Sequence, residues 1–203
     1  MPLSAHEKNR APRLGQRAFS AMNRAVFLDR DGALIEERHY LSRVEDVVIF
    51  SGAGAALKRL QDAGYLLFIV TNQSGVGRGY FTMDDVEKIH AYLTVEFARE
   101  DVRFQKIYVA PEHPDLPSRG RKPSPQFLFD ARDEFGVDLA QSYMVGDKLI
   151  DLECGWNAGV KQSFLVRTGY GGKLEKESPE KLVRATVADG LAAVADAILT
   201  DKP

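Results

Sequence analysis

Five short, mainly apolar runs divide the chain, and they lie at residues 25–28, 65–70, 106–109, 142–146 and 163–166. Runs of this kind are typical of parallel strands that are buried on both faces. The segments between and after them carry apolar residues at helical spacing and predict helices at residues 55–63, 83–97, 125–135, 149–159 and 190–199. The alternation predicts an α/β fold in which a doubly wound parallel sheet lies between two helical layers with right-handed crossovers.

The connecting segments are too short to hold another domain. Residues 33–50 mix polar and apolar positions and predict a loop or a small hairpin. Residues 111–120 form a polar, proline-containing loop, and the glycine-rich residues 167–172 predict a flexible turn. We therefore expect no cap domain.

The amino-terminal residues 1–23 differ in composition from the rest of the chain. They are rich in Arg, Lys, Ala, Ser and Pro, lack an apolar period, and predict a basic, disordered arm without an export signal. The remaining residues 24–200 are expected to form a single domain, because 44% of the 203 residues are apolar, enough for a sizeable core.

Charge and cysteine content narrow the classes of partner and compartment. A formal net charge of −2 gives no electrostatic reason to bind nucleic acid or an anionic membrane, and no apolar run approaches the length of a membrane span. The single Cys154 excludes an internal disulfide and fits a reducing compartment. We expect a cytoplasmic monomer.

Candidate chemistry first appears at the end of the first strand, where Asp29 and Asp31 precede Gly32. Ligands bind at the carboxyl ends of strands in open α/β sheets. Two close carboxylates repel each other unless a cation lies between them, so a hard divalent ion such as Mg²⁺ is the natural partner. A calcium loop is less suitable because the glycine comes too early, whereas an ordinary strand-ending turn remains an alternative.

Polar groups follow the later strands as well. Residues 71–75 supply hydroxyl, amide and backbone N–H groups that suit a phosphate, although a turn stabilised by its own hydrogen bonds is the simpler alternative. Lys122, just before a helix, is either a solvated lysine or the cation of such a phosphate site. Asp147 and Asp151 follow the fourth strand and place further carboxylates at this edge.

Together these motifs resemble the haloacid dehalogenase (HAD) superfamily of phosphohydrolases over residues 24–172, through residues 29–32, Thr71, Lys122 and residues 146–151. The resemblance implies a sheet of strand order 3-2-1-4-5. The finer pattern is similar to the histidinol-phosphatase-like subfamily, which includes the heptose bisphosphate phosphatases, at residues 28–32, 70–79, 121–123 and 143–148. Ser74 and the Arg78-Gly79 pair favour the heptose branch, whose substrate is a small phosphorylated sugar.

The resemblance also implies a mechanism with an aspartyl-phosphate intermediate. Asp29 would be the nucleophile and Asp31 the general acid and base, while Thr71 and Lys122 would hold the transferring phosphate. Mg²⁺ would be bound by Asp29, Asp147 and the backbone carbonyl of Asp31. Asp151 would orient Lys122 or a metal-bound water. The residues implied to line the substrate are Glu37, Arg38, His39, Tyr40, Asn72, Gln73, Ser74, Arg121 and Lys148.

Three departures from the family pattern bear on this interpretation. Ala33 replaces a threonine, which removes a hydroxyl from the catalytic turn. Many relatives bind zinc through three Cys and one His after the third strand, whereas this chain has Ala110, Glu112 and His113 near those positions and no cysteine, so we expect no structural zinc. Residues 37–40 differ from the commoner acidic-His-Gly-Tyr pattern and leave the exact sugar open.

Three other functions remain as alternatives. A phosphatase for histidinol phosphate or another small sugar phosphate would use the same chemistry. A signalling receiver domain also has a phosphate-accepting Asp, a Thr and a Lys, but it lacks an acid or base equivalent to Asp31. A phosphosugar-binding protein without activity would tolerate Ala33 but would not need every ionisable residue of the site.

Overall fold

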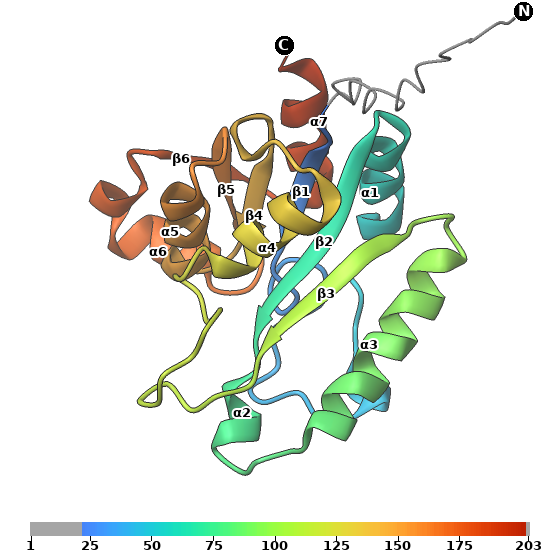
Figure 1. Ribbon diagram of the computed structural model, residues 1–203, viewed down its shortest axis with the longest axis vertical. Coiled ribbons are helices and arrows are strands. Elements are labelled where there is room, and N and C mark those ends of the chain that lie inside the picture. Colours follow the sequence, from blue (N-terminus) through green and yellow to red (C-terminus); the bar gives the residue numbers. More distant parts are fainter. Residues whose placement is uncertain (1–21, 202–203) are drawn as a thin grey trace, which may run out of the picture.

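The computed structural model describes residues 22–201, and these residues form a six-stranded, all-parallel sheet (Figure 1). The strand order is β3-β2-β1-β4-β5-β6, which confirms the expected order and adds an edge strand, β6, that the sequence analysis did not predict. The strands are β1 (Arg24–Leu28), β2 (Tyr65–Asn72), β3 (Phe104–Ala110), β4 (Tyr143–Gly146), β5 (Gln162–Val166) and β6 (Ala185–Ala188).

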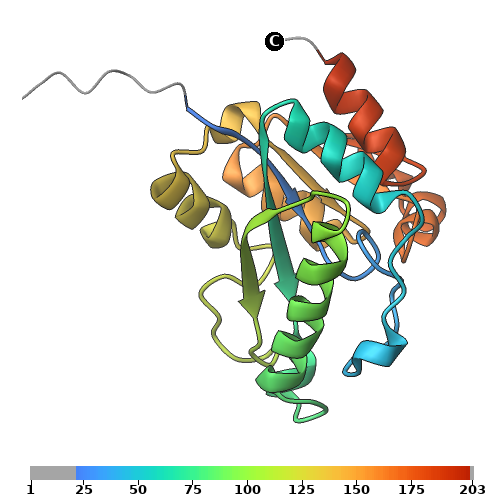
Figure 2. The ribbon, with the colours of Figure 1, turned by 90° about the vertical axis from the view of Figure 1, so that its right-hand side faces the viewer.

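Helices cover both faces of the sheet. They are α1 (Ala53–Asp62), α2 (Ser74–Gly77), α3 (Met83–Ala98), α4 (Gln126–Phe135), α5 (Leu149–Ala158), α6 (Gly171–Glu177) and α7 (Leu191–Thr200), with short 3₁₀ turns η1 (Val44–Asp46), η2 (Leu139–Gln141) and η3 (Pro179–Leu182). Apolar residues of α1, α3 and α7 pack on one face, and those of α4 and α5 pack on the other. In Figure 2, α1, α3 and α7 lie on one side of the sheet and α4 on the opposite side.

The alternation of side chains along β1 shows how the two cores arise from one buried strand. Val26 and Leu28 belong to the core beneath α1, α3 and α7, whereas Ala25 and Phe27 belong to the core beneath α4 and α5. Both faces of the strand are therefore covered, as the uninterrupted apolar run predicts.

Helix ends follow their expected signals with small shifts. Thr82 and Asp85 form a capping box at the start of α3, and Gly136 ends α4 in the left-handed region with φ 63°. The helix expected from Ala55 begins at Ala53, because Gly52 at φ 76° turns the chain into the helix two residues earlier.

The connections are mostly as short as predicted. Residues 33–50 form a loop that contains η1 and a single antiparallel bridge between Ile35 and Ile49 rather than a hairpin. The described residues between Asp31 and Thr71 otherwise hold only α1 and β2. The expected flexible turn at residues 167–172 is partly wrong, because α6 begins at Gly171.

Only the last residues of the predicted amino-terminal arm are described by the structure. Residues 1–21 of the predicted arm lie outside the described residues. Asn23, which we had also assigned to the arm, is tied to the domain, since its N–H donates to the Gly136 carbonyl at 2.9 Å and its carbonyl accepts from the Asp138 N–H at 2.8 Å. Over residues 22–201, no helix combines the length and apolar content that crossing a bilayer requires.

Candidate active site

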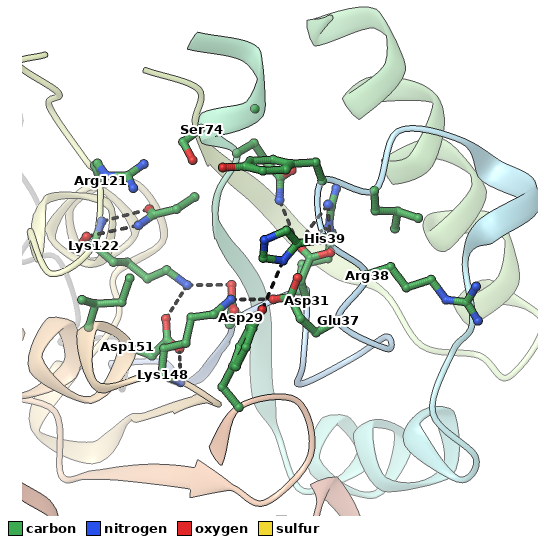
Figure 3. A pocket seen from close by; sticks show the side chains of 18 of the residues that line it. Asp29, Asp31, Glu37, Arg38, His39, Ser74, Arg121, Lys122, Lys148 and Asp151 are labelled. Atoms are coloured by element: carbon green, nitrogen blue, oxygen red, sulfur yellow. Dashed lines mark hydrogen bonds and ion pairs between the residues drawn. The ribbon is translucent and has the colours of Figure 1, made fainter. Parts of the chain in front are cut away.

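The carboxyl end of β1 presents a buried ion-pair chain that begins at Asp29. The Lys122 ammonium donates to Asp29 Oδ1 at 2.6 Å and lies 2.6 Å from Asp151 Oδ1 (Figure 3). The side chains of the three residues are between 1% and 6% exposed. Burial tends to lower the pKa of a lysine, but the two carboxylates outweigh this effect and raise the pKa of Lys122. Lys122 is therefore a fixed cation beside Asp29, not the solvated lysine considered as an alternative.

Asn72 holds the backbone of this lysine. Its amide donates to the Lys122 carbonyl at 3.1 Å, and its carbonyl oxygen accepts from the Lys122 N–H at 3.0 Å. Asn72 lines the pocket as predicted, but both polar atoms of its side chain are engaged by the chain itself. Its contacts are those of a residue that positions Lys122 rather than one that reads a substrate.

Three carboxylates converge beside the ion-pair chain. Asp29, Asp147 and Asp151 each offer an oxygen atom within 4.8 Å of the others. Asp147 Oδ2 accepts from the Tyr170 N–H at 2.8 Å, but Asp147 Oδ1 is buried without a hydrogen-bond partner. Burial is the main cause that raises the pKa of Asp147 to about 8 and that of Asp29 to about 6, and the mutual repulsion of the carboxylates adds to it. An unpartnered oxygen in a buried acidic cluster fits a hard divalent cation.

Two glycines let the strand-end turns approach this cluster. Gly32 has φ 90° and Gly169 has φ 57°, and a Cβ atom at either position would lie 2.2 Å from Asp147 Oδ2. The Thr168 hydroxyl donates to the Gly32 carbonyl at 2.6 Å. The turn after β1 thus receives a hydroxyl from another turn, although Ala33 supplies none.

Asp31 has an environment different from that of Asp29. Arg30 donates to both of its carboxylate oxygens, each at 3.0 Å, and the Gln73 amide donates to Oδ2 at 2.9 Å. Burial tends to raise the pKa of Asp31, but the charge of Arg30 and the hydrogen bonds from Arg30 and Gln73 outweigh it and lower the pKa below its usual value. The contacts with Arg30 and Gln73 therefore favour the ionised form of Asp31.

A pocket of about 330 Å³ opens above these groups. Every residue that we expected to face the substrate contributes to its lining, namely Glu37, Arg38, His39, Tyr40, Asn72, Gln73, Ser74, Arg121 and Lys148. Asp29, Asp31, Lys122 and Asp151 also line it. Thr71 and Asp147 do not, because they are buried beneath the pocket at 1% and 0% exposure. The predicted catalytic and substrate-facing residues therefore converge on one site.

Arg38 and Arg121 differ in how freely they face this pocket. The guanidinium of Arg38 pairs with Glu36 at 3.1 Å and points away from the other labelled side chains in Figure 3. Arg121 Nη1 is buried and lacks a hydrogen-bond partner, and burial together with the nearby charge of Arg78 lowers the pKa of Arg121. An unpaired, partly desolvated guanidinium is suited to an anion.

The comparisons with known proteins agree with this arrangement. A family model described as HAD-hydrolase-like matches residues 120–194. The D-glycero-beta-D-manno-heptose-1,7-bisphosphate 7-phosphatase of Haemophilus ducreyi is 40% identical over 82% of this chain and 95% of its own length. The Escherichia coli K12 protein of the same name is 37% identical over 81% of this chain and 90% of its own. This chain belongs to the heptose bisphosphate phosphatase family.

A solved structure agrees with this membership. The heptose bisphosphate phosphatase from B. bronchiseptica, complexed with magnesium and phosphate, superimposes with a TM-score of 0.80 at 32% sequence identity. The match covers 88% of this chain and 99% of the other. The chain is thus a HAD phosphatase, and the expected superfamily, fold and enzyme class are confirmed.

Tyr170 also lines the pocket, although the sequence did not predict it as a site residue. Its hydroxyl lies 3.3 Å from His39 Nδ1, and its ring centroid lies 5.0 Å from the Lys148 ammonium. Lys148 in turn pairs with Glu37 at 2.6 Å. These contacts join the loop after β1 to the turn after β5 across the pocket. Arg30, Leu41, Gly75, Phe81 and Ile150 also line the pocket and were not predicted.

Hydrogen bonds connect the ends of the loop at residues 111–120, where we expect no structural zinc. The Ser118 hydroxyl donates to Glu112 Oε2 at 2.6 Å and accepts from the Arg121 N–H at 3.2 Å. The Gly77 N–H donates to the Pro111 carbonyl at 2.9 Å and ties the loop to α2.

Because residues 111–120 contain no cysteine, we expect purified protein to contain no stoichiometric zinc and to keep its melting temperature in a chelator. Activity should disappear in the chelator and return with Mg²⁺. Elemental analysis and a thermal melt measure the two properties, and one zinc per chain would contradict the prediction.

Proposed function

We propose that this phosphatase hydrolyses the 7-phosphate of D-glycero-D-manno-heptose 1,7-bisphosphate with the help of Mg²⁺. The observation that carries the proposal is that the cations lining one pocket include two with different surroundings. Lys122 is paired with the candidate nucleophile, and Arg121 has an unpartnered, buried N–H. A substrate with two phosphates would use both positions, one for the phosphate that is transferred and one for the phosphate that is retained.

Asp29 is the nucleophile in the proposed reaction. One of its oxygens is held by Lys122, and the other would attack phosphorus to form an aspartyl phosphate. Lys122 would neutralise charge on the transferring oxygens, and Asp151 keeps Lys122 in place. Thr71 accepts a hydrogen bond from Gln73 at 2.8 Å, and its hydroxyl would support the phosphate from below.

Asp31 is the proposed acid and base. It would donate a proton to the leaving alkoxide and later take one from the attacking water. The carboxylate is ionised when Arg30 and Gln73 alone surround it, so it must first take up a proton. An anionic phosphate next to Asp31 favours that uptake, because a nearby negative charge raises the pKa of a carboxyl group.

The acidic cluster is the proposed magnesium site. Asp29 and Asp147 would hold the ion through side-chain oxygens, and the backbone carbonyl of Asp31 would supply a third ligand. Asp151 is engaged by Lys122 and by the Lys148 N–H at 2.9 Å, so we assign it to positioning Lys122. Bound Mg²⁺ supplies the positive charge that offsets repulsion between these carboxylates and the phosphate.

The alternative functions fit the site less well. A receiver domain needs no residue in the place of Asp31, yet here Asp31 accepts three hydrogen bonds at the pocket. A protein that only binds phosphosugars gains nothing from a buried carboxylate paired with Lys122. We further propose that the enzyme works as a monomer in the cytoplasm, and its single cysteine supports a reducing compartment.

Substrate preference tests the proposed function. We expect kcat/KM for heptose 1,7-bisphosphate to exceed that for histidinol phosphate at least about tenfold, which corresponds to about 1.4 kcal/mol of transition-state binding. Steady-state assays of phosphate release with Mg²⁺ would measure the ratio. Equal values for the two substrates would contradict the assignment of the sugar while leaving the phosphatase chemistry intact.

A matched variant links this preference to Arg121. Arg121→Gln should lower kcat/KM for the bisphosphate and reduce the preference, since the retained phosphate loses its cation. Arg59→Gln is the control, because the exposed Arg59 guanidinium pairs with Asp196 at 2.7 Å and does not line the pocket. A preference unchanged in Arg121→Gln would show that the second phosphate is bound elsewhere.

A further inference from the structure

Arg30 is the largest fully buried side chain among the described residues, and it lies between the two candidate catalytic carboxylates in sequence. Only 1% of its side chain is exposed. A buried guanidinium is unfavourable unless its N–H groups are paired, so its partners indicate its role.

The guanidinium has two partners, which lie on different elements. Nε and Nη2 donate to the two oxygens of Asp31, both at 3.0 Å, and Nη1 lies 3.2 Å from His90 Nε2. His90 is a buried residue of α3 that is 8% exposed. Within residues 22–201, the hydrogen bonds of the Arg30 guanidinium go only to these two side chains, and none goes to a backbone carbonyl.

His90 completes the arrangement as an acceptor. Arginine has no acceptor atom, so His90 Nε2 must lack a proton when it bonds to Arg30. Burial, and next the charge of Arg30, lower the pKa of His90 to about 4, so the imidazole is neutral at ordinary pH. A neutral His90 therefore fixes the end of the guanidinium that faces away from Asp31.

We propose that Arg30, held by His90, is a positioning residue that fixes the carboxylate of Asp31 in the orientation required for proton transfer. The two parallel N–H···O bonds of a guanidinium define the plane of a carboxylate, which a single ammonium cannot do. Gln73 supports the same carboxylate from another side at 2.9 Å. The inference rests on the proposed function, because it assigns Arg30 to the proton transfers of that reaction.

The experiment compares two substrates that differ in their need for a proton. An alkyl phosphate such as the sugar bisphosphate requires protonation of its leaving oxygen, whereas p-nitrophenyl phosphate does not. The variants are Arg30→Lys, which keeps the charge but loses the paired geometry, His90→Leu, which removes the acceptor, and His90→Gln, which keeps an acceptor. Single-turnover phosphorylation rates are measured for each substrate with Mg²⁺.

We expect Arg30→Lys to lose about 10²-fold in phosphorylation by the alkyl phosphate, because a small misplacement of a catalytic group costs about that much. His90→Leu should lose about tenfold and His90→Gln less than either. With p-nitrophenyl phosphate, phosphorylation should fall by less than about threefold in all variants. Phosphoenzyme should accumulate in Arg30→Lys and His90→Leu, since hydrolysis of the aspartyl phosphate still needs a base.

Leu93→Ala is the control for a general loss of packing. Leu93 is fully buried on α3, one turn from His90, and has no hydrogen bond to the site. Its substitution should lower the melting temperature but leave the ratio of the two phosphorylation rates unchanged. Equal losses on both substrates in Arg30→Lys and His90→Leu, or a changed ratio in Leu93→Ala, would overturn the positioning role. Failure of the wild-type enzyme to cleave either substrate would instead overturn the proposed function.

Discussion

Asp29→Asn should abolish phosphoryl transfer. The amide nitrogen and oxygen of asparagine are too weakly nucleophilic to form an acyl phosphate, and the substitution also removes a charge from the acidic cluster proposed to hold the metal. We expect turnover to fall below about 10⁻⁴ of the wild-type rate, because a covalent route cannot proceed without its nucleophile. Phosphate release from heptose 1,7-bisphosphate measures the loss.

The matched control for this isosteric change is Asp84→Asn. Asp84 lies on the exposed face of α3, where it pairs with Lys88 at 2.5 Å and is 71% exposed. Its loss should leave turnover and melting temperature nearly unchanged, because surface pairs contribute little. A circular dichroism melt of Asp29→Asn would show that the fold is intact. Activity within about tenfold of wild type would mean that Asp29 is not the nucleophile.

Asp31→Asn should lose about 10²–10⁴-fold in turnover of the sugar bisphosphate, which is the usual contribution of general acid and base catalysis. The side chain keeps its size, but its amide NH₂ group opposes the donors of Arg30 and Gln73 and cannot exchange the proton. The loss should therefore be large but smaller than that of Asp29→Asn. Steady-state rates at saturating Mg²⁺ measure it.

A second substrate separates the two steps in the same variant. The nitrophenolate of p-nitrophenyl phosphate leaves without a proton, so Asp31→Asn should form phosphoenzyme faster than it hydrolyses it. Rapid quench should show a burst that approaches one equivalent, bound to Asp29 and labile to hydroxylamine. Without a burst, or with the label found on Asp31, the division of roles between the two aspartates would be wrong.

The sequence predicts the central sheet well because each strand is marked by the apolar residues of its own short segment. Each of the first five strands is a short apolar run, and burial on both faces makes such a run hard to mistake. The candidate site follows from the same feature, since parallel strands place their carboxyl ends at one edge. Asp29, Lys122 and Asp151 are far apart in sequence, yet they meet because each lies after the carboxyl end of a parallel strand, namely β1, β3 and β4.

The carboxyl-terminal elements are less predictable because their sequences are weak signals. Strand β6 has four residues, pairs only with β5 and buries only one of them fully, so it carries no strongly apolar run. Helix α6 begins with Gly171 and Gly172, which favour a turn by local propensity. Packing on the rest of the domain decides the structure of both segments.

The site residues Arg30, His90 and Tyr170 were not predicted for a different reason. In the sequence, Arg30 is simply the residue between two aspartates, and nothing marks it as a contact of Asp31. Its partner His90 lies on α3, where the apolar spacing of the helix already accounts for the burial of His90. Tyr170 lies in a segment whose glycines indicate a turn, and only the tertiary structure brings it to His39. Polar pairs between distant segments have no periodicity, so a single sequence does not reveal them.

Gly32 and Gly169 have a consequence for recognising active members of this family in genomes. Asp147 leaves no space for a side chain at either position, so a residue larger than glycine at either one requires Asp147 to move. A homologous sequence that keeps both aspartates of the first motif but carries alanine at either glycine would pass a simple motif search. We expect such a sequence to encode a protein with a displaced Asp147, and thus a pseudoenzyme.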